Sequence, residues 1–362
     1  MCIFCKFTPI FCTGSGGSVV ANRLTENARW SVLLLEAGRD ENFFTDVPLM
    51  ASLHSSSSYN WGYKSERLNT SCLGLIDGKC NMVRGKALGG TSVINFLLYT
   101  RGNRLESRFH RWSYKDVLPY FIKSENCTLC EDIDQAYHGK SGYMNIEHPG
   151  FESPMVKLFL KAGQDLGYKN NDPNGKFGLG VGPRELLEKV KIPVIQNLRV
   201  GYNLQDHMAM STLAFLVNES VTVSDLSVQN PIHIYNYLVE GKGPYTIPGG
   251  AEALAFIKTK YSPKANDDYP DMELVLGAGA LNGDVHGSFR NLLGIPDSLF
   301  RKVYMPIMEK PAFGIATVLL RPKSRGRVLI KDSNPLHWPI LKPNYFEIEE
   351  DLATMVEGIK TV

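Results

Sequence analysis

The sequence lacks long hydrophobic runs and any strong excess of charge. It contains no uninterrupted apolar run of roughly 18 residues, the length that a bilayer-spanning helix needs. Its formal net charge is +2, which gives no support for nucleic acid or an acidic membrane surface as a partner. Internal repeats are also absent. With 43% hydrophobic and 21% charged residues, the 362-residue chain has the composition of a globular protein that is long enough for two domains.

Cysteine patterns typical of metal sites are also missing. Cys127 and Cys130 have the C-x-x-C spacing, but no second pair and no pair of histidines follows at zinc-finger distance. The flanking sequence does not have the strand and helix that surround a thioredoxin-like pair. We therefore expect no metal site. Cys72 and Cys80 enclose the turn-rich stretch LGLIDGK, a loop that a disulfide would close.

Signals for secretion point in two directions. Three N-x-S/T sequons, at Asn69, Asn126 and Asn218, favour an extracellular protein. The first twelve residues, MCIFCKFTPIFC, do not have the form of a signal peptide, because Lys6 and Pro9 interrupt the apolar stretch and no small-residue cleavage site follows. The body of the chain thus predicts an extracellular location, whereas its start supplies no signal peptide.

The first region with a clear pattern is residues 10–38, IFCTGSGGSVVANRLTENARWSVLLLEAG. Apolar spacing predicts a helix over 16–27, and an apolar run predicts a buried strand over 31–35. A strand, a glycine turn, a helix and a second strand are the order of a dinucleotide-binding unit. Glu36 ends the second strand about twenty residues after the glycines, where such units carry an acidic residue.

The chemistry of such a unit explains its residue types. Glycines let the backbone approach a pyrophosphate, free N–H groups at the helix start hold it, and the acid accepts hydrogen bonds from ribose hydroxyls. The candidate binding residues are Gly14, Ser15, Gly17 and Glu36. The pattern is incomplete, since Cys12 stands at the first glycine position and Pro9, in the preceding strand, cannot donate to a sheet ladder. A plain glycine turn, with Glu36 as a surface acid, therefore remains an alternative.

Later segments predict ordinary secondary structure. Proline at the first helical position and apolar spacing indicate helices near 153–167 and 230–241, and helical spacing recurs at the end of the chain, in 349–362. Alternating patterns predict the strands of an antiparallel sheet at 211–217, 252–257 and 313–320.

The stretch RGKALGGTSVINFLLY, residues 84–99, is the most specific in the sequence. Together with TGSGGSVVANRL, VLLLEAG and YNWGYKSE, it resembles the glucose–methanol–choline (GMC) family of FAD-dependent oxidoreductases, in particular its insect glucose dehydrogenase-like branch. Scattered blocks continue this resemblance as far as LLRPKSRGRVLIKDSNP.

The resemblance implies an α/β protein in which a Rossmann-like FAD-binding domain is interleaved with an α+β substrate domain built on an antiparallel sheet. Residues 1–150 and 175–210 would form the FAD-binding domain. Residues 151–174 and 211–345 would form the substrate domain. Residues 346–362 would begin a return to the FAD-binding domain.

The resemblance also implies FAD as the cofactor, with the 84–99 loop lying over the flavin. It implies oxidation of a CH–OH group by hydride transfer to flavin N5, with a small alcohol or sugar as substrate and a quinone-type electron acceptor. The loop residues that would contact FAD are Gly89, Gly90, Thr91, Asn95, Phe96, Leu97 and Leu98. Glycine permits the close backbone approach that such contacts need.

Several departures from the family pattern affect the expected activity. Near 175–185 the chain lacks a segment of several dozen residues, and the stretch after Arg101 is also shorter than usual. The catalytic histidine block of the family would lie beyond Val362, so no catalytic residue is assigned. His207 matches a position outside the catalytic pair, where a structural role is expected.

These departures predict that the chain by itself binds FAD poorly and has little or no dehydrogenase activity. A non-catalytic paralogue that acts as a binding or interaction protein is the alternative. An NAD-dependent dehydrogenase is disfavoured, because only the incomplete glycine pattern supports it.

Overall fold

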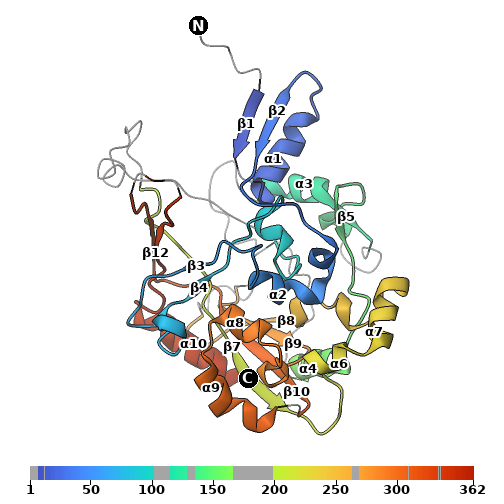
Figure 1. Cartoon of the computed structure of the whole chain (residues 1–362), viewed down its shortest axis with the longest axis vertical. Coiled ribbons are helices and arrows are strands. Elements are labelled where there is room, and N and C mark those ends of the chain that lie inside the picture. The colour runs from blue at the N-terminus through green and yellow to red at the C-terminus, as the bar shows by residue number, and fades with distance from the viewer. Residues whose placement is uncertain are drawn as a thin grey trace.

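The computed structural model describes residues 7–11, 13–101, 114–128, 135–165, 199–262, 269–308, 310–332, 334 and 336–362. A small parallel βαβ unit near the N-terminus lies at one end of the molecule, and a larger antiparallel sheet with its helices lies at the other (Figure 1). The 84–99 segment and its neighbours lie between these two regions.

The N-terminal unit has the predicted order. β1 (Phe7–Phe11) is followed by α1 (Ser15–Thr25) and then by β2 (Ser31–Leu35), which pairs with β1 in parallel. Pro9 lies opposite Leu33 in this ladder. In the part of the chain that the structure describes, β1 pairs with β2 alone, so it is an edge strand, where proline is tolerated.

The N-terminal unit leaves much of its apolar surface uncovered. Leu33, Leu34 and Leu35 of β2 are 40–45% exposed, and Val19 and Val20 of α1 are at least half exposed. Strands of parallel sheets are normally buried on both faces by helices. This unit therefore has less packing to hold it than the rest of the fold.

The larger sheet has four antiparallel strands in the order β7, β10, β9, β8. Its strands are β7 (Ala209–Leu216), β8 (Ala251–Ile257), β9 (Met272–Gly277) and β10 (Ala312–Leu319). This confirms the predicted antiparallel sheet and three of its strands. The fourth strand, β9, was not predicted, although its alternate residues are buried.

The C-terminal helix α10 (Glu349–Thr361) packs on this sheet. Its Met355 lies in a buried cluster with Met272 of β9 and Leu319 of β10. Asp351 lies in the first turn of α10. Its carboxylate accepts hydrogen bonds from the backbone N–H groups of Lys323 and Ser324, at 2.8 Å each, and so holds the start of the helix against that segment. The segment expected to begin a return to the FAD-binding domain thus contacts the antiparallel sheet in the described residues.

Other predicted helices form with shorter bounds. The helix expected near 153–167 is α4 (Pro154–Asp165), and the one near 230–241 is α7 (Pro231–Tyr235), extended by a π-helical turn to Glu240. The remaining α-helices in the described residues are α2 (Ala51–Ser55), α3 (Tyr114–Ser124), α6 (Asp225–Val228), α8 (Ser288–Leu293) and α9 (Asp297–Val303). The remaining strands are β3 (Tyr63–Lys64), β4 (Asn81–Met82), β5 (Glu125–Cys127), β6 (Met144–Ile146), β11 (Arg327–Leu329) and β12 (Ile340–Lys342).

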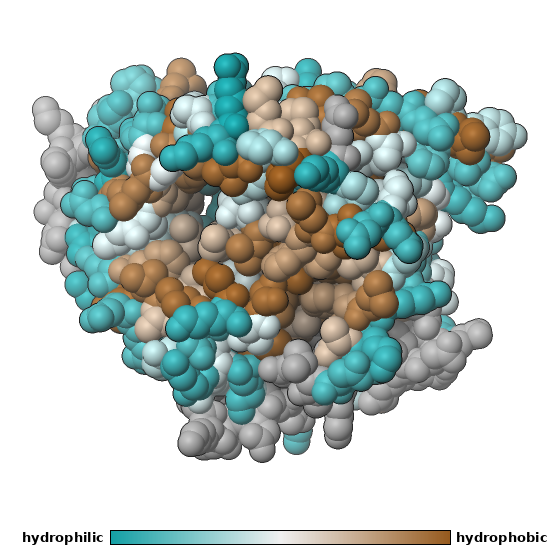
Figure 2. Space-filling view, turned by 90° about the horizontal axis from the view of Figure 1, so that it is seen from below, coloured by the Kyte–Doolittle hydropathy of each residue, from teal (hydrophilic) through white to brown (hydrophobic). Residues whose placement is uncertain are grey.

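The surface is mixed in character. Figure 2 shows apolar residues gathered across the middle of one face, with hydrophilic residues mostly around them. Exposed apolar side chains of α9 and α10 include Val303, Leu352 and Val356. Among the described residues, no helix combines the length and the apolar character needed to cross a bilayer.

The predicted disulfide between Cys72 and Cys80 is present, with their Cα atoms 5.5 Å apart. It closes a short loop, and Cys80 is buried beside Leu68 and Tyr345. Cys127 is also disulfide-bonded, whereas Cys130 lies outside the described residues. Cross-links of this kind form in oxidising compartments.

Replacing both Cys72 and Cys80 by serine should lower stability by about 2–3 kcal/mol, because the unfolded chain regains the freedom of the short loop. For a protein of this size the melting temperature should fall by about 5 °C in differential scanning calorimetry. Wild-type protein treated with a reducing agent should show at least as large a decrease, because reduction also breaks the disulfide of Cys127. An unchanged melting temperature in both samples would contradict a stabilising role.

Candidate flavin-binding site

The glycine turn before α1 and the 84–99 loop meet through their backbones. Gly90 has a left-handed backbone, with φ of +59°, and a Cβ added to it would lie 2.6 Å from Cα of Gly14. Gly89 is left-handed too, with φ of +109°. We call this contact between Gly14 and Gly89–Gly90 the glycine crossing. The loop expected to cover a flavin thus packs first against the glycine turn of the N-terminal unit.

Two further glycines permit close backbone contacts at this loop, Gly38 between the loop and the chain that follows β2, and Gly85 within the loop itself. A Cβ at Gly38 would lie 2.1 Å from the backbone nitrogen of Ala87, and a Cβ at Gly85 would lie 2.1 Å from the carbonyl oxygen of Gly90. Arg39 and Ala87 form a parallel β-bridge at the same place. Only glycine fits at these approaches, which explains the glycine content of the loop.

Glu36 connects the three segments of the site. Its Oε2 accepts hydrogen bonds from the backbone nitrogen and the hydroxyl of Thr13, at 2.9 and 2.7 Å, and its Oε1 accepts one from the Gly38 nitrogen at 2.7 Å. The Thr13 hydroxyl in turn accepts a hydrogen bond from the Gly89 nitrogen at 3.0 Å. Sequence reasoning missed Thr13, whose partners are distant along the chain.

The pKa of Glu36 reflects these contacts. Partial burial raises it, but the hydrogen bonds from Thr13 and Gly38 outweigh burial and hold the pKa of the carboxyl below its ordinary value. Glu36 therefore stays charged at neutral pH. Oε2 already accepts two hydrogen bonds and Oε1 accepts one, so the expected contact with a ribose hydroxyl would fall on Oε1.

The start of α1 has the space and the donors that a diphosphate needs. No atom lies within 4 Å of a Cβ added to Gly14 or Gly16. Gly14 is the N-cap residue and supplies no capping side chain, so the N–H groups of the first turn have no cap from it. Ser15 is exposed and Gly17 is half-buried in the same turn. These residues fit the pyrophosphate of FAD, which free amides at a helix start attract.

The loop residues after the glycine crossing are turned in different directions. Thr91 accepts a hydrogen bond from the Gly85 nitrogen at 3.1 Å and so stabilises the loop itself. The Asn95 side chain accepts one from the Leu97 nitrogen at 3.0 Å, which supports the left-handed backbone of Leu97. Leu97 and Leu98 are both more than 40% exposed and present an apolar surface.

Phe96 ties the loop to the antiparallel sheet. A Cβ at Gly249, in the turn that precedes β8, would lie 2.3 Å from Cγ of Phe96. The two parts of the fold therefore meet beside the loop, where ligand sites commonly form. The structure brings Gly14, Glu36, Gly89 and Gly90 together, whereas Phe96 lies against Gly249.

Beyond the loop, Arg101 anchors its C-terminal end. The Arg101 guanidinium forms an ion pair with Glu125 and donates hydrogen bonds to the Tyr137 carbonyl at 2.8 Å and to the Tyr99 hydroxyl at 3.1 Å. The side chains of Arg101 and Glu125 have no solvent exposure. We call Tyr99, Arg101, Glu125 and their partner His138 the Arg101 cluster.

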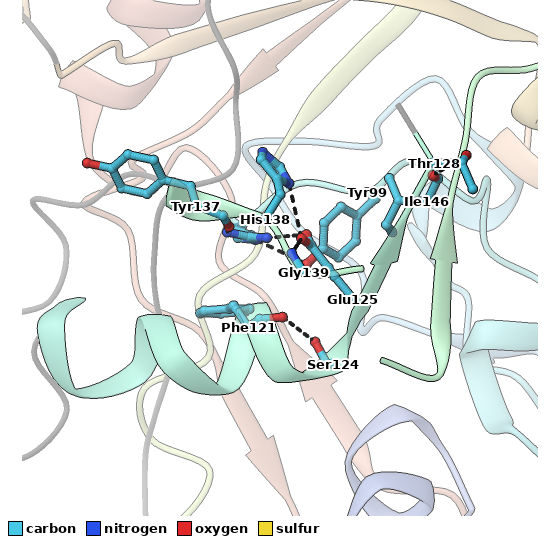
Figure 3. Close-up of polar contacts among 10 residues, drawn as sticks. Tyr99, Phe121, Ser124, Glu125, Thr128, Tyr137, His138, Gly139 and Ile146 are labelled. Carbon is cyan, nitrogen blue, oxygen red and sulfur yellow. Dashed lines mark hydrogen bonds and ion pairs between the residues drawn. The ribbon is translucent and has the colours of Figure 1, made fainter. Parts of the chain in front are cut away.

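Glu125 is fully satisfied in this cluster. Figure 3 shows His138, Tyr99 and Gly139 around it. His138 Nδ1 lies 3.0 Å from Oε2 of Glu125, and the Gly139 nitrogen donates to the same oxygen at 3.2 Å. Burial raises the pKa of Glu125, but Arg101, the Gly139 nitrogen and Tyr99 lower it by more, so its pKa lies below the ordinary value and the carboxyl is charged.

The histidines with described contacts have structural partners. His207 hydrogen-bonds with the backbone of Leu320, which agrees with the structural role expected for it. His54, His138, His286 and His337 have hydrogen-bond partners of their own. His110 lies outside the described residues. Among the residues that the structure describes, no group of three or more His, Cys, Asp or Glu could hold a metal ion.

The fold combines an N-terminal parallel βαβ unit, the glycine crossing and a four-stranded antiparallel sheet. This combination is typical of the FAD-binding oxidoreductase fold. The GMC oxidoreductase profile matches residues 16–194. The chain carries a GMC oxidoreductase domain, and GMC oxidoreductases depend on FAD.

Relatives agree with this assignment. Glucose dehydrogenase [FAD, quinone] of Drosophila pseudoobscura pseudoobscura is 28% identical over 96% of this chain and 68% of its own length. Ecdysone oxidase of Bombyx mori is 26% identical over 96% of this chain and 65% of its own length. Formate oxidase of Aspergillus oryzae RIB40 has the same fold, with a TM-score of 0.78 and 19% identity over 98% of this chain and 80% of that chain.

The length of these matches shows where the chain differs from its relatives. The match to the Drosophila protein runs over 442 positions, more than the 362 residues of the whole chain. The relative therefore carries segments, inside the matched region, that have no counterpart here. The gaps expected near 175–185 and after Arg101 stay predictions, because the match gives the number of such positions and not their place.

Proposed function

We propose that this protein binds FAD at the glycine crossing and takes part in oxidising the CH–OH group of a small alcohol or sugar. The final electron acceptor in this proposal is a quinone-type compound. The observation that carries the proposal is the open helix start of α1 beside the backbone contact between Gly14 and Gly90. Bound FAD supplies the hydride acceptor, at flavin N5. The proposal includes the division into an FAD-binding domain (1–150, 175–210) and a substrate domain (151–174, 211–345).

Each part of the site has a physical task in this proposal. Ser15 and Gly17, in the first turn of α1, donate backbone N–H groups to the pyrophosphate. Glu36 binds the ribose and keeps Thr13 in place. The exposed side chains of Leu97 and Leu98 cover the flavin ring and exclude water from it.

We also propose that the 362-residue chain made by itself turns over slowly or not at all. The described histidines with assigned contacts are held by structural partners. General-base catalysis typically contributes about 10²–10⁴-fold in rate. A site without a positioned base therefore binds substrate and cofactor but reacts slowly.

The test is an assay of the purified chain with FAD, a panel of alcohols and sugars, and a quinone or dye as acceptor. We expect FAD to bind weakly, because segments of the family pattern are missing, and substrate-dependent acceptor reduction to stay close to that of FAD alone. Rapid turnover would overturn the proposed lack of a base. A chain that binds no flavin would overturn the proposed cofactor site and favour the non-catalytic alternative.

A further inference from the structure

Two of the three sequons lie on open surface. Asn218 is exposed in the bend that follows β7, together with the other two residues of its sequon. Asn69 is also exposed, in the loop before the Cys72–Cys80 disulfide. In the described part of the chain, no hydrogen bond engages the side chain of either asparagine. Both amides are therefore free to carry a bulky substituent.

The sequon of Asn69 contains a hydroxyl that the fold does not use. Ser71, its third residue, is only 6% exposed, and its Oγ has no hydrogen-bond partner. Burying an unpaired hydroxyl costs about 1–3 kcal/mol. Its neighbour Thr70 differs, since its hydroxyl donates to the Tyr345 carbonyl at 2.6 Å. The Ser71 hydroxyl makes no hydrogen bond that would stabilise the folded protein, but the N-x-S/T sequon of Asn69 requires it.

The third sequon is engaged in the fold. Asn126 lies in β5, and its side-chain nitrogen donates to Oδ1 of Asn145 in β6 at 2.9 Å. The Thr128 backbone nitrogen and hydroxyl lie 3.1 and 3.2 Å from the Ile146 carbonyl, and Figure 3 shows Thr128 beside Ile146. Cys127, between them, is disulfide-bonded and buried. A glycan on the side-chain nitrogen of Asn126 would compete with its hydrogen bond to Asn145 between β5 and β6.

We propose that Asn69 and Asn218 are N-glycosylated and that Asn126 is not. The side-chain amide nitrogen of each asparagine bonds to the anomeric carbon of an oligosaccharide that a lipid pyrophosphate carries. The bond from that carbon to the pyrophosphate breaks, the lipid pyrophosphate leaves, and the amide loses one proton. The disulfides at Cys72–Cys80 and at Cys127 place the chain in the oxidising compartment in which this donor is found.

Because the hydroxyl of Ser71 is buried in the folded protein, modification of Asn69 must precede local folding of this loop. The attached glycan then projects from the exposed asparagine. The Ser71 hydroxyl is therefore needed before folding, for modification of Asn69. It does not stabilise the folded protein, because it has no hydrogen-bond partner there.

The experiment is expression of the chain in insect cells behind an endoplasmic reticulum leader, followed by peptide mass spectrometry before and after glycosidase treatment. We expect glycans on the peptides with Asn69 and Asn218 and an unmodified peptide with Asn126. Absence of glycans from both expected sites would overturn the proposal, and a glycan on Asn126 would overturn its selectivity.

Two neighbouring substitutions provide a matched pair. Ser71→Ala should remove the glycan at Asn69 and leave the melting temperature of the deglycosylated protein unchanged or higher. Thr70→Val should keep the glycan and lower the melting temperature, because the hydrogen bond to Tyr345 is lost. A retained glycan in Ser71→Ala, or a lower melting temperature after deglycosylation, would show that the Ser71 hydroxyl has another role.

Discussion

Replacing Glu125 by alanine should destabilise the protein by about 3–5 kcal/mol, the largest effect that we expect from a single substitution. The reason is that the Arg101 guanidinium, which has no solvent exposure, would lose its carboxylate partner and remain charged inside the protein. Thermal and urea unfolding of the purified variant measure this loss.

Two other variants make the result interpretable. Asp165→Ala removes an exposed i,i+4 ion pair with Lys161 and should change stability by less than about 0.5 kcal/mol. The double variant Arg101→Met with Glu125→Leu removes both buried charges and should recover much of the loss, which keeps the test valid even if Glu125→Ala does not fold. A Glu125→Ala protein as stable as Asp165→Ala would show that the ion pair contributes little.

Replacing Gly90 by alanine should weaken FAD binding at least tenfold, which corresponds to about 1.4 kcal/mol. The left-handed backbone costs a non-glycine residue roughly 1–2 kcal/mol, and the new methyl would push against Gly14. Because this contact sets the position of the helix start, a shift there moves the donors proposed for the pyrophosphate.

Gly74→Ala is the matched control, because no atom lies within 4 Å of a Cβ at that position. It should bind FAD as the unchanged protein does. Fluorescence titration of FAD measures both variants. Equal affinity for FAD in Gly90→Ala and Gly74→Ala would show that the glycine crossing does not shape the site.

Local structure was largely predictable from the sequence, because it depends on neighbouring residues. The apolar run at 31–35 became β2, Gly14 is the N-cap of α1, and Cys72 pairs with Cys80 across the turn-rich loop. Pro9 also agrees with the observed edge position of β1. The resemblance to the GMC family singled out the 84–99 loop and predicted FAD as the cofactor; contact between the two stays a prediction.

Long-range contacts were not predictable in the same way. Gly90 was expected to approach a flavin, but in the structure its backbone also approaches Gly14, which lies more than seventy positions away. Thr13 has no local signal for its role between Glu36 and Gly89. The partners of Arg101 likewise follow from tertiary packing, as does the contact of α10 with the antiparallel sheet.

The most direct test of the central claim is a titration of the purified chain with FAD and with riboflavin, followed by flavin fluorescence. The uncapped amides at the start of α1 attract an anionic group, and FAD carries a diphosphate there whereas riboflavin has no phosphate. Our account therefore predicts that FAD binds at least tenfold more tightly than riboflavin and that added salt reduces this preference. Equal affinity for the two, or no binding of FAD, would contradict a flavin site at the glycine crossing.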